Sequence, residues 1–235
     1  MKSLNILSGG AAQGLVASLA SAFKVRTGFD IAGEYGAVGA MADKLRGGVP
    51  TDIIILTAAL VAKLADEKLA VPTSIADVDL VETAVAVRAG DPKVTVGDAA
   101  SLRAALLAAD AIFVPDTKAS TAGIHIAKVL AQLGIAETVA DRLKVHPNGA
   151  TAMRQLAASD AARPIGCTQS TEIIATRGIV LSGPLPPECE LKTMYTAAVT
   201  THAANAGAAQ ILIDVLTSSD AQAARTRAGF VGGDL

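Results

Sequence analysis

The sequence lacks tryptophan, and aromatic residues make up only 3% of its 235 residues. Platforms on which nucleic-acid bases or sugar rings stack are therefore scarce. The sequence also has no basic cluster, and its net charge is −2, so the positive footprint of a nucleic-acid-binding protein is missing. These features exclude nucleic acid as an expected partner and favour a small ligand.

Long apolar runs and metal-ligand spacings are also missing. No segment approaches the length of a membrane span, so no membrane insertion is expected. The two cysteines, Cys167 and Cys189, form neither a disulfide framework nor a metal-binding pattern, and we expect structural thiols and no metal. The first residues lead directly into an apolar strand without the apolar segment of a signal peptide. This predicts a cytoplasmic protein for the sequence as written, and a periplasmic one if a leader peptide has been removed.

The sequence is rich in hydrophobic residues, 51% of the total, which is ample for a buried core. Short β-branched runs alternate with alanine-rich helical patterns, and this alternation predicts an α/β fold of one large or two small domains. Helices are expected near residues 12–27, 40–46, 58–70, 99–108, 124–133, 203–216 and 220–227. Strands are expected near residues 30–35, 52–56, 81–88, 111–114, 164–167 and 192–200, and a loop at residues 183–188.

The chain begins with a strand that runs into a glycine-rich turn and then a helix. Such a turn leaves backbone N–H groups unpaired and directed at whatever lies beyond the strand, usually an anion. The alternative is that the glycines only let the helix pack closely against the sheet. The candidate ligand-binding residues of this turn are Ser8, Gly9, Gly10, Ala11 and Gln13.

Two further predicted strands end in similar turns. Ala37 and Val38 lie in the second turn, and Thr57 follows the third strand, where it is predicted to cap the next helix. Ligands of open parallel sheets bind beyond the carboxyl ends of the strands. The three turns are therefore expected to face one ligand site.

The most polar strand-to-helix turn follows residue 115. Thr121 is a predicted helix cap, and Gly123 is expected to let the backbone approach a ligand. His125 lies in the first helical turn, where a neutral imidazole is favoured. A structural histidine and a solvated Lys118 are the plain alternatives.

Other candidates follow in the same part of the chain. Asn148 and Gly149 begin a helix after a short strand and either present donors or only form a tight turn. Gln169 lies in a cluster of hydrogen-bonding residues after another strand. With Ala122, these residues complete the predicted ligand set.

Several segments in this order resemble one known family, the type II periplasmic binding proteins, and most of all their molybdate-binding group. The segments are Leu4-Asn5-Ile6-Leu7-Ser8-Gly9-Gly10, Phe23 to Gly28, Tyr35-Gly36-Ala37-Val38-Gly39-Ala40, Gly48-Val49-Pro50-Thr51-Asp52-Ile53-Ile54-Ile55, Ala221-Gln222 and Gly229-Phe230. The resemblance implies two Rossmann-like lobes, residues 1–83 plus 197–235 and residues 84–196, with a ligand cleft between them. It also implies hinge strands at 81–88 and 193–200, and a membrane permease as partner if the protein is exported.

The sequence departs from the molybdate-binding group at the residues that would hold the oxyanion. That group typically presents serine hydroxyls at the first two turns and a tyrosine from the second lobe. Here Ala11 and Ala37 lie near the first two positions, and Gln169 stands where the tyrosine is expected. Because an oxyanion needs many neutral donors, an organic carboxylate is favoured over molybdate.

Two functions remain open. The first is binding of a small anionic ligand without chemistry, which is favoured. The second is a cofactor-independent isomerase that moves a proton on a di- or tricarboxylate, similar to aconitate isomerase. His125 would be its base or acid, with Lys118 and Glu34 as alternates. No cofactor motif is present, so no cofactor is expected.

Overall fold

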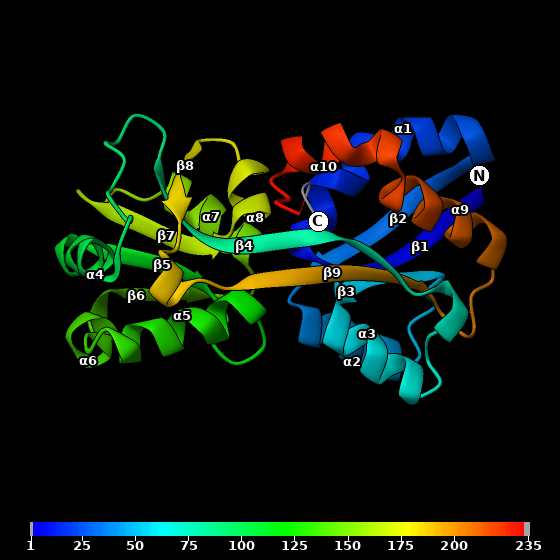
Figure 1. Cartoon of the computed structure of the whole chain (residues 1–235), viewed down its shortest axis with the longest axis horizontal. Coiled ribbons are helices and arrows are strands. Elements are labelled where there is room, and N and C mark those ends of the chain that lie inside the picture. Colours follow the sequence, from blue (N-terminus) through cyan, green and yellow to red (C-terminus); the bar gives the residue numbers. More distant parts are fainter. Residues whose placement is uncertain (1, 233–235) are drawn as a thin grey trace. The chain divides into compact units, whose positions relative to one another are not determined.

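The computed structural model describes residues 2–232, which form two compact units. Among these residues, unit 1 comprises 2–81 and 193–232, and unit 2 comprises 82–192. The chain passes into unit 2 within strand β4 (Ala76–Arg88) and returns at the start of strand β9 (Lys192–Val199) (Figure 1). The predicted α/β class is confirmed, whereas lobe limits at residues 83 and 196 stay a prediction.

The sheet of unit 1 is built around its first strand. Strand β1 (Lys2–Gly9) lies between β2 (Phe29–Gly36) and β3 (Ile53–Thr57), and both neighbours run parallel to it. Strand β9 is antiparallel to β3 on the other side. Every residue of β3 except the last is buried, as expected for a continuous apolar strand covered on both faces.

Helices cover both faces of this sheet. Figure 1 shows α1, α9 and α10 on one face and α2 and α3 on the other. Gly28, with a φ of 74°, ends α1 in the left-handed conformation, where the sequence predicts the helix to stop. The α-helices described in unit 1 are α1 (Gln13–Thr27), α2 (Val38–Arg46), α3 (Ala58–Asp66), α9 (Ala206–Thr217) and α10 (Gln222–Ala228). Short 3-10 helices lie at Gly10–Ala12, Pro72–Ser74 and Ser219–Ala221.

Asp52, which ends the Gly48-Val49-Pro50-Thr51-Asp52 motif, is a buried structural carboxylate. One of its oxygens accepts a hydrogen bond from the backbone N–H of Asn5, and the other accepts one from the backbone N–H of Asn205, each at 2.8 Å. The side chain thereby joins β1 to the start of α9 at the amino end of β3. This motif supports the fold, at the end of β3 away from the turn that opens α3.

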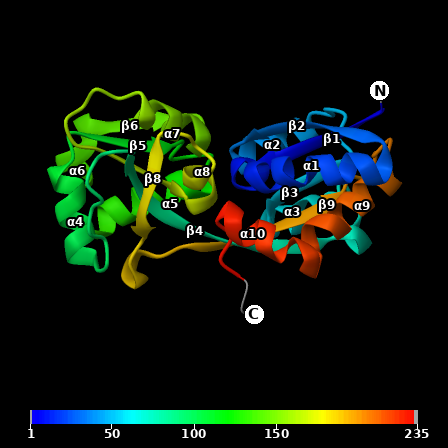
Figure 2. The same cartoon turned by 90° about the horizontal axis from the view of Figure 1, so that it is seen from above.

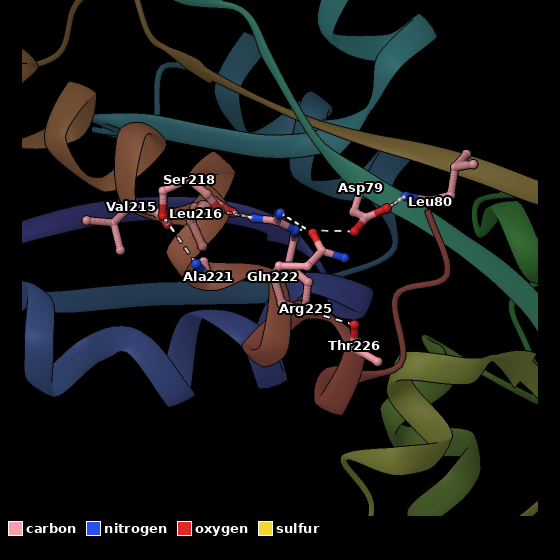
Figure 3. Close-up of polar contacts among 9 residues, drawn as sticks. All are labelled: Asp79, Leu80, Val215, Leu216, Ser218, Ala221, Gln222, Arg225 and Thr226. Atoms are coloured by element: carbon pink, nitrogen blue, oxygen red, sulfur yellow. Dashed lines mark hydrogen bonds and ion pairs between the residues drawn. The ribbon is translucent and has the colours of Figure 1, made fainter. Parts of the chain in front are cut away.

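A buried ion pair fixes the first half of β4 to α10 (Figure 3). Arg225 Nε lies 3.3 Å from Asp79 Oδ2, and the two side chains are only 8% and 9% exposed. Arg225 Nη1 also donates to the carbonyl oxygens of Leu216 and Ser218, at 2.7 and 2.9 Å. The guanidinium group therefore joins β4, the end of α9 and α10.

The residues after α10 return to the same strand. Gly229, with a φ of 94°, ends α10 in the left-handed conformation, and Phe230 is buried in the core of unit 1. The backbone N–H of Val231 then donates to the carbonyl oxygen of Leu80, at 2.9 Å. The closing Gly-Phe pair is thus a helix cap followed by a core residue.

The sheet of unit 2 has the order β4-β7-β5-β6. Strand β5 (Ala111–Pro115) runs parallel to β7 (Pro164–Gln169) and to β6 (Leu143–His146). Strand β4 is antiparallel to β7 and also pairs with β8 (Ile179–Pro184). The carboxyl ends of β5, β6 and β7 therefore lie at one edge.

Alternating side chains of β5 divide the core of unit 2 between the two faces of the sheet. Ile112 and Val114 pack with α4, α5 and α6, whereas Ala111 and Phe113 pack with α7 and α8. Figure 2 shows α7 beside α8. The α-helices described in unit 2 are α4 (Ala99–Ala108), α5 (Thr121–Gln132), α6 (Ala136–Val139), α7 (Gly149–Ala157) and α8 (Ser170–Ile174). Short 3-10 helices lie at Ala140–Arg142 and Pro187–Cys189.

The structure corrects several predicted boundaries. The loop expected at residues 183–188 is wrong in part, because Gly183 and Pro184 end β8, a position where proline tolerates the loss of its donor. Helix α3 ends before residue 70, because Lys68 has a φ of 62°. Strand β4 begins at Ala76 and α5 at Thr121, both earlier than predicted.

Candidate functional site

Unit 1 places three strand-to-helix turns side by side. Gly9 at the end of β1 is in register with Gly36 at the end of β2, and Ser8 is in register with Ile55 of β3. Because the three strands are parallel, α1, α2 and α3 all begin at this edge. The register brings together the three turns that the sequence singles out in this unit.

These three helix starts have no side-chain cap among the residues that the structure describes. Ala12, Ala37 and Thr57 occupy the N-cap positions of α1, α2 and α3, and none of their side chains bonds to the helix start. Thr57 takes the predicted N-cap position, but its hydroxyl does not bond to the start of α3, so the prediction holds for the position and not for the capping hydrogen bond. The helical stretch that contains α1 begins at Gly10 in the preceding 3-10 helix, because the backbone N–H of Gln13 donates to the carbonyl oxygen of Gly10. The first backbone N–H groups of that stretch, of α2 and of α3 have no side-chain acceptor at their N-cap positions. Ala37 and the following Val38 are both nearly buried.

The candidate residues of the first turn differ in exposure. Ser8 is fully buried, and its hydroxyl donates to the carbonyl oxygen of Gly9 at 2.9 Å. Ala11 is also buried, whereas Gly10 is partly exposed and Gln13 is exposed. The serine hydroxyl is thus engaged with the backbone, and the accessible groups are those of Gly10 and Gln13.

Tyr195 in β9 belongs to this cluster, although the sequence does not predict it. The antiparallel pairing of β9 with β3 places Tyr195 opposite Thr57. A Cβ atom at Gly9 would lie 2.7 Å from Tyr195 Cε1 and 2.8 Å from Val38 Cγ1, so close packing accounts for this glycine. The available signal was that Tyr195 is one of only two tyrosines and interrupts a strand of small residues.

Unit 2 also aligns three strand-to-helix turns. Pro115 at the end of β5 is in register with His146 at the end of β6, and Phe113 is in register with Gly166 of β7. Helices α5, α7 and α8 therefore begin at one edge of this sheet. Every candidate of the later part of the sequence belongs to one of these turns.

The turn before α5 is held by Asp116. Its Oδ1 accepts hydrogen bonds from the backbone N–H groups of Lys118 and Ala119, at 2.7 and 2.9 Å, which lowers the pKa of Asp116. The side chain of Lys118 is exposed. The N-cap residue is Ser120, so the prediction that Thr121 caps the helix is wrong.

The start of α5 packs closely against the protein itself. A Cβ atom at Gly123 would lie 2.1 Å from the carbonyl oxygen of Asp116, so this glycine lets the helix approach the backbone of its own turn. The neighbouring Ala122 is buried. The His125 ring places Nε2 2.8 Å from the carbonyl oxygen of Cys189, which fixes the imidazole to the 3-10 helix before β9. The close approach at Gly123 and the hydrogen bond of His125 both support the packing of α5 within unit 2.

Helix α7 is capped by its predicted first residues. Asn148 Oδ1 accepts a hydrogen bond from the backbone N–H of Thr151, at 2.8 Å. The space beside Gly149 is filled, because a Cβ atom there would lie 1.9 Å from Glu172 Oε2 and 2.2 Å from Thr168 Oγ1. Gly149 is therefore required where the carboxyl group of Glu172 meets the start of α7.

Glu172, in the first turn of α8, is a buried acid that the sequence does not single out. Thr168 Oγ1 donates to Glu172 Oε2 at 2.6 Å, and the backbone N–H groups of Ala150 and Gln169 also bond to the carboxyl group. Burial raises the pKa of Glu172, and these three hydrogen bonds act in the opposite direction. The sequence feature that could have identified Glu172 is an acid in the first turn of a helix whose other residues are apolar or carry hydroxyl groups. Gln169 itself is buried.

His146 is a second titratable group beside this edge. Its ring stacks on Phe113, with 5.8 Å between centroids and 5° between planes. Nε2 is buried and has no hydrogen-bond partner within residues 2–232. Burial lowers the pKa of His146, because the charged imidazolium would be desolvated.

The three candidate catalytic residues occupy different settings. His125 and Lys118 belong to unit 2, where the imidazole bonds to a backbone carbonyl and the lysine is exposed. Glu34 belongs to unit 1 and forms an exposed ion pair with Lys44. The ion pair matches the plain alternative of a solvated surface carboxylate.

The part of the chain that the structure describes contains no group of three or more histidine, cysteine, aspartate or glutamate side chains suited to a metal ion. Cys167 and Cys189 are both buried, and burial raises the pKa of the Cys167 thiol to about 12. Across residues 2–232, no helix is both long and apolar enough to cross a bilayer.

Residues 4–231 match a protein family described as bacterial extracellular solute-binding protein. A curated relative, an aconitate isomerase of a Pseudomonas species, is 25% identical over 238 residues, which cover 97% of this chain and 87% of the relative.

Solved structures with a similar fold include a periplasmic molybdate-binding protein of Azotobacter vinelandii, with a TM-score of 0.81, 19% identity and coverage of 97% of this chain and 98% of the other. A sulfate-binding protein of Mycobacterium tuberculosis has a TM-score of 0.77, also with 19% identity, and coverage of 100% and 88%. At this identity the likeness concerns the fold.

Proposed function

This chain belongs to the bacterial extracellular solute-binding proteins and has the type II periplasmic binding protein fold, and on this basis we propose that it binds a small anion. The preferred ligand is an organic carboxylate rather than a tetrahedral oxyanion of the molybdate type. A membrane permease is a partner only of an exported form of the protein, and such a form would act in the periplasm.

The observation that carries the proposal is the set of three uncapped helix starts in unit 1. α1, α2 and α3 begin at adjacent ends of parallel strands, and within residues 2–232 no side chain caps them. Their backbone N–H groups and helix dipoles favour negative charge. An anionic ligand supplies the acceptors that the side chains of these turns do not provide.

The preference for a carboxylate follows from the side chains at the same turns. Ser8 uses its hydroxyl on the carbonyl oxygen of Gly9, while Ala11 and Ala37 offer only methyl groups. The acceptor oxygens of a tetrahedral oxyanion surround one central atom, so the ion requires several neutral donors close together. Carboxylate groups spaced along a carbon skeleton can instead accept from separate helix starts.

Thermal-shift measurements and calorimetry with molybdate, sulfate, citrate and trans-aconitate test the proposal. A ligand that binds only the folded state raises the apparent stability, by about 2.7 kcal/mol at a concentration of about 100 times Kd. We expect the organic carboxylates to stabilise the protein more than the inorganic oxyanions do. Stabilisation by molybdate and sulfate alone would contradict the carboxylate preference, and no response to any anion would contradict anion binding.

A pair of glutamine variants tests the role of Gln169. Gln169 is buried in the turn before α8, whereas Gln155 is exposed on α7, so Gln155→Ala is a matched control. Removing a hydrogen bond to a charged group costs about 1.5–3 kcal/mol, which corresponds to about a tenfold to hundredfold increase in Kd. Equal affinities of the two folded variants would remove Gln169 from the site.

A second candidate function is proton transfer on a di- or tricarboxylate, and the relative named aconitate isomerase is the observation that favours it. His125 is the first candidate for the base or acid, with Lys118 and Glu34 as alternates. Because the carbonyl oxygen of Cys189 can only accept, Nε2 carries the ring hydrogen, and Nδ1 is the nitrogen left to take up and release the substrate proton. Proton NMR of cis- and trans-aconitate in heavy water would detect isomerisation and exchange. Turnover that is lost in a folded His125→Ala variant supports this function, and its absence in the unmodified protein contradicts it.

A further inference from the structure

A cavity of about 240 Å³ lies within unit 2, between the segment that follows β4, helix α4 and the first residues of β7. Ala111 at the start of β5 is in register with Pro164 at the start of β7, so the amino ends of these two strands meet at this edge of the sheet. The candidate turns of unit 2 follow the carboxyl ends of the same strands. The cavity is therefore separate from the turns, and every residue that lines it belongs to unit 2.

Apolar side chains form most of the wall of the cavity. Val87 of β4 and Ile165 of β7 line its deeper part, because they are only 2% and 3% exposed. Helix α4 contributes Ala105 and Ala108, whose small side chains leave space that a longer side chain would fill. An apolar cavity of about 150 Å³ is enough to bind benzene, so this cavity has room for a ring or a short hydrocarbon chain.

The segment after β4 is held in place by the protein itself. The backbone N–H of Val94 donates to Ser182 Oγ in β8, at 3.4 Å. Val96 is buried and packs with α4 in the core of unit 2. The wall of the cavity is thus formed without a ligand, which lowers the cost of ordering it on binding.

Three charged residues line the cavity, and two of them are neutralised by neighbours. Arg88 Nε lies 2.8 Å from Asp91 Oδ2, and Arg163 Nη2 lies 3.0 Å from Asp110 Oδ1. Lys93 is exposed, and its ammonium group has no ion-pair or hydrogen-bond partner within residues 2–232. The mouth of the cavity therefore carries one uncompensated positive charge.

We propose that this cavity binds a small amphipathic monocarboxylate, with the hydrocarbon part against Val87, Ile165 and α4 and the carboxylate beside Lys93. The apolar wall favours burial of hydrocarbon, and one free cation matches one carboxylate. The inference goes beyond the anion binding proposed above and does not depend on it, because that binding rests on the turns of unit 1. A compact di- or tricarboxylate lacks the apolar surface that this cavity would bury, so the two sites differ in the class of ligand.

NMR titrations with butyrate, hexanoate and octanoate test the apolar part of the site. Each additional CH₂ group that becomes buried should lower Kd by about fourfold, and the shifted amide signals should include those of Val94 and Ile165. Ala105→Leu fills the cavity and should abolish the dependence of Kd on chain length. Ala104→Leu is the matched control, because Ala104 is exposed on the same helix and does not line the cavity.

Octanamide, a neutral analogue of octanoate, tests the charge at the mouth. Lys93→Gln should raise Kd for octanoate by up to about fivefold, as expected for an exposed ion pair, and should leave Kd for octanamide unchanged. Lys128→Gln, which changes an exposed lysine on α5, is the matched control. Equal effects of Lys93→Gln on both ligands would overturn the pairing of the carboxylate with Lys93.

A second filling variant covers the case in which Ala105→Leu fails to fold. Ala108→Leu places the same side chain at another residue of the wall and should weaken octanoate binding in the same way. Absence of octanoate binding to the unmodified protein, or equal Kd values in a folded filling variant and in Ala104→Leu, would overturn the inference. Binding of trans-aconitate to the same variants should be unchanged, so its loss or absence would concern the proposed function alone.

Discussion

Replacing Arg225 by methionine tests the buried ion pair that holds β4 in unit 1. The substitution keeps most of the side-chain volume but removes the charge that faces Asp79 at 3.3 Å. It also leaves the carbonyl oxygens of Leu216 and Ser218 without the guanidinium donor. Because both members of the pair are more than nine-tenths buried, loss of one partner should lower the free energy of unfolding by about 3–5 kcal/mol.

Arg227→Met is the matched control, because Arg227 lies in the same helix with an exposed side chain. Its effect should stay within about 0.5 kcal/mol. A double variant, Arg225→Met with Asp79→Asn, should be less destabilised than the sum of the single changes, by about 0.5–3 kcal/mol.

Urea unfolding followed by far-ultraviolet circular dichroism suits this chain, which has no tryptophan. Two compact units allow two transitions, so amide hydrogen exchange in β1 and β7 assigns each transition to its unit. The Arg225→Met change should appear in the transition of unit 1. An effect no larger than that of Arg227→Met, or additive effects in the double variant, would refute a stabilising role for the ion pair.

Three further outcomes follow from the structure. Lowering the pH below about 6.5 should destabilise the protein through His146, because its lowered pKa keeps the ring neutral in the folded state while the unfolded state binds a proton. Urea titrations at several pH values should show that the free energy of unfolding falls less on acidification in His146→Phe. Gly9→Ala should lower the free energy of unfolding by about 1–3 kcal/mol, because the added Cβ would meet the Tyr195 ring. Gly207→Ala, whose added Cβ would meet nothing within 4 Å in α9, should raise the free energy of unfolding by about 0.5–1 kcal/mol. Thermal denaturation that ranks the two variants in the opposite order would contradict the packing at Gly9. Cys167 should resist alkylation in the folded state, because burial raises its thiol pKa to about 12, and mass spectrometry should find it modified only after unfolding.

The local sequence pattern was sufficient to predict the limits of elements that depend on their own residues. Helix α4 has the predicted limits, and Asp98 caps it by accepting from the backbone N–H of Ser101 at 2.7 Å. Strand β3 has nearly the predicted limits, because a continuous apolar run fits a parallel strand covered on both faces. Strand β8 was missed, because Gly183 and Pro184 are typical of loops and are tolerated here only at a strand end.

The contacts at the candidate site depend on strand register, which local pattern does not reveal. The sequence identifies the turns at Gly9 and Gly149 and offers anion binding or close packing for the first and donors or a tight turn for the second, but it does not show which residues either glycine meets. Those residues are distant in the sequence, since Tyr195 fills the space beside Gly9 and Glu172 fills that beside Gly149. His125 likewise finds its partner in the carbonyl oxygen of Cys189. The sequence thus predicts the turns, whereas Tyr195, Glu172 and the contacts between distant residues come only from the structure.

The division of the chain also sets the order in which the protein is completed during synthesis. Unit 2 is one continuous segment, residues 82–192, whereas unit 1 needs residues from both sides of it. Strand β3 pairs with β9 and Leu80 accepts its hydrogen bond from Val231, and both partners are translated after the whole of unit 2. Unit 1 is therefore finished only after unit 2, and the edge of β3 that pairs with β9 must stay unpaired with other strands until β9 has been translated.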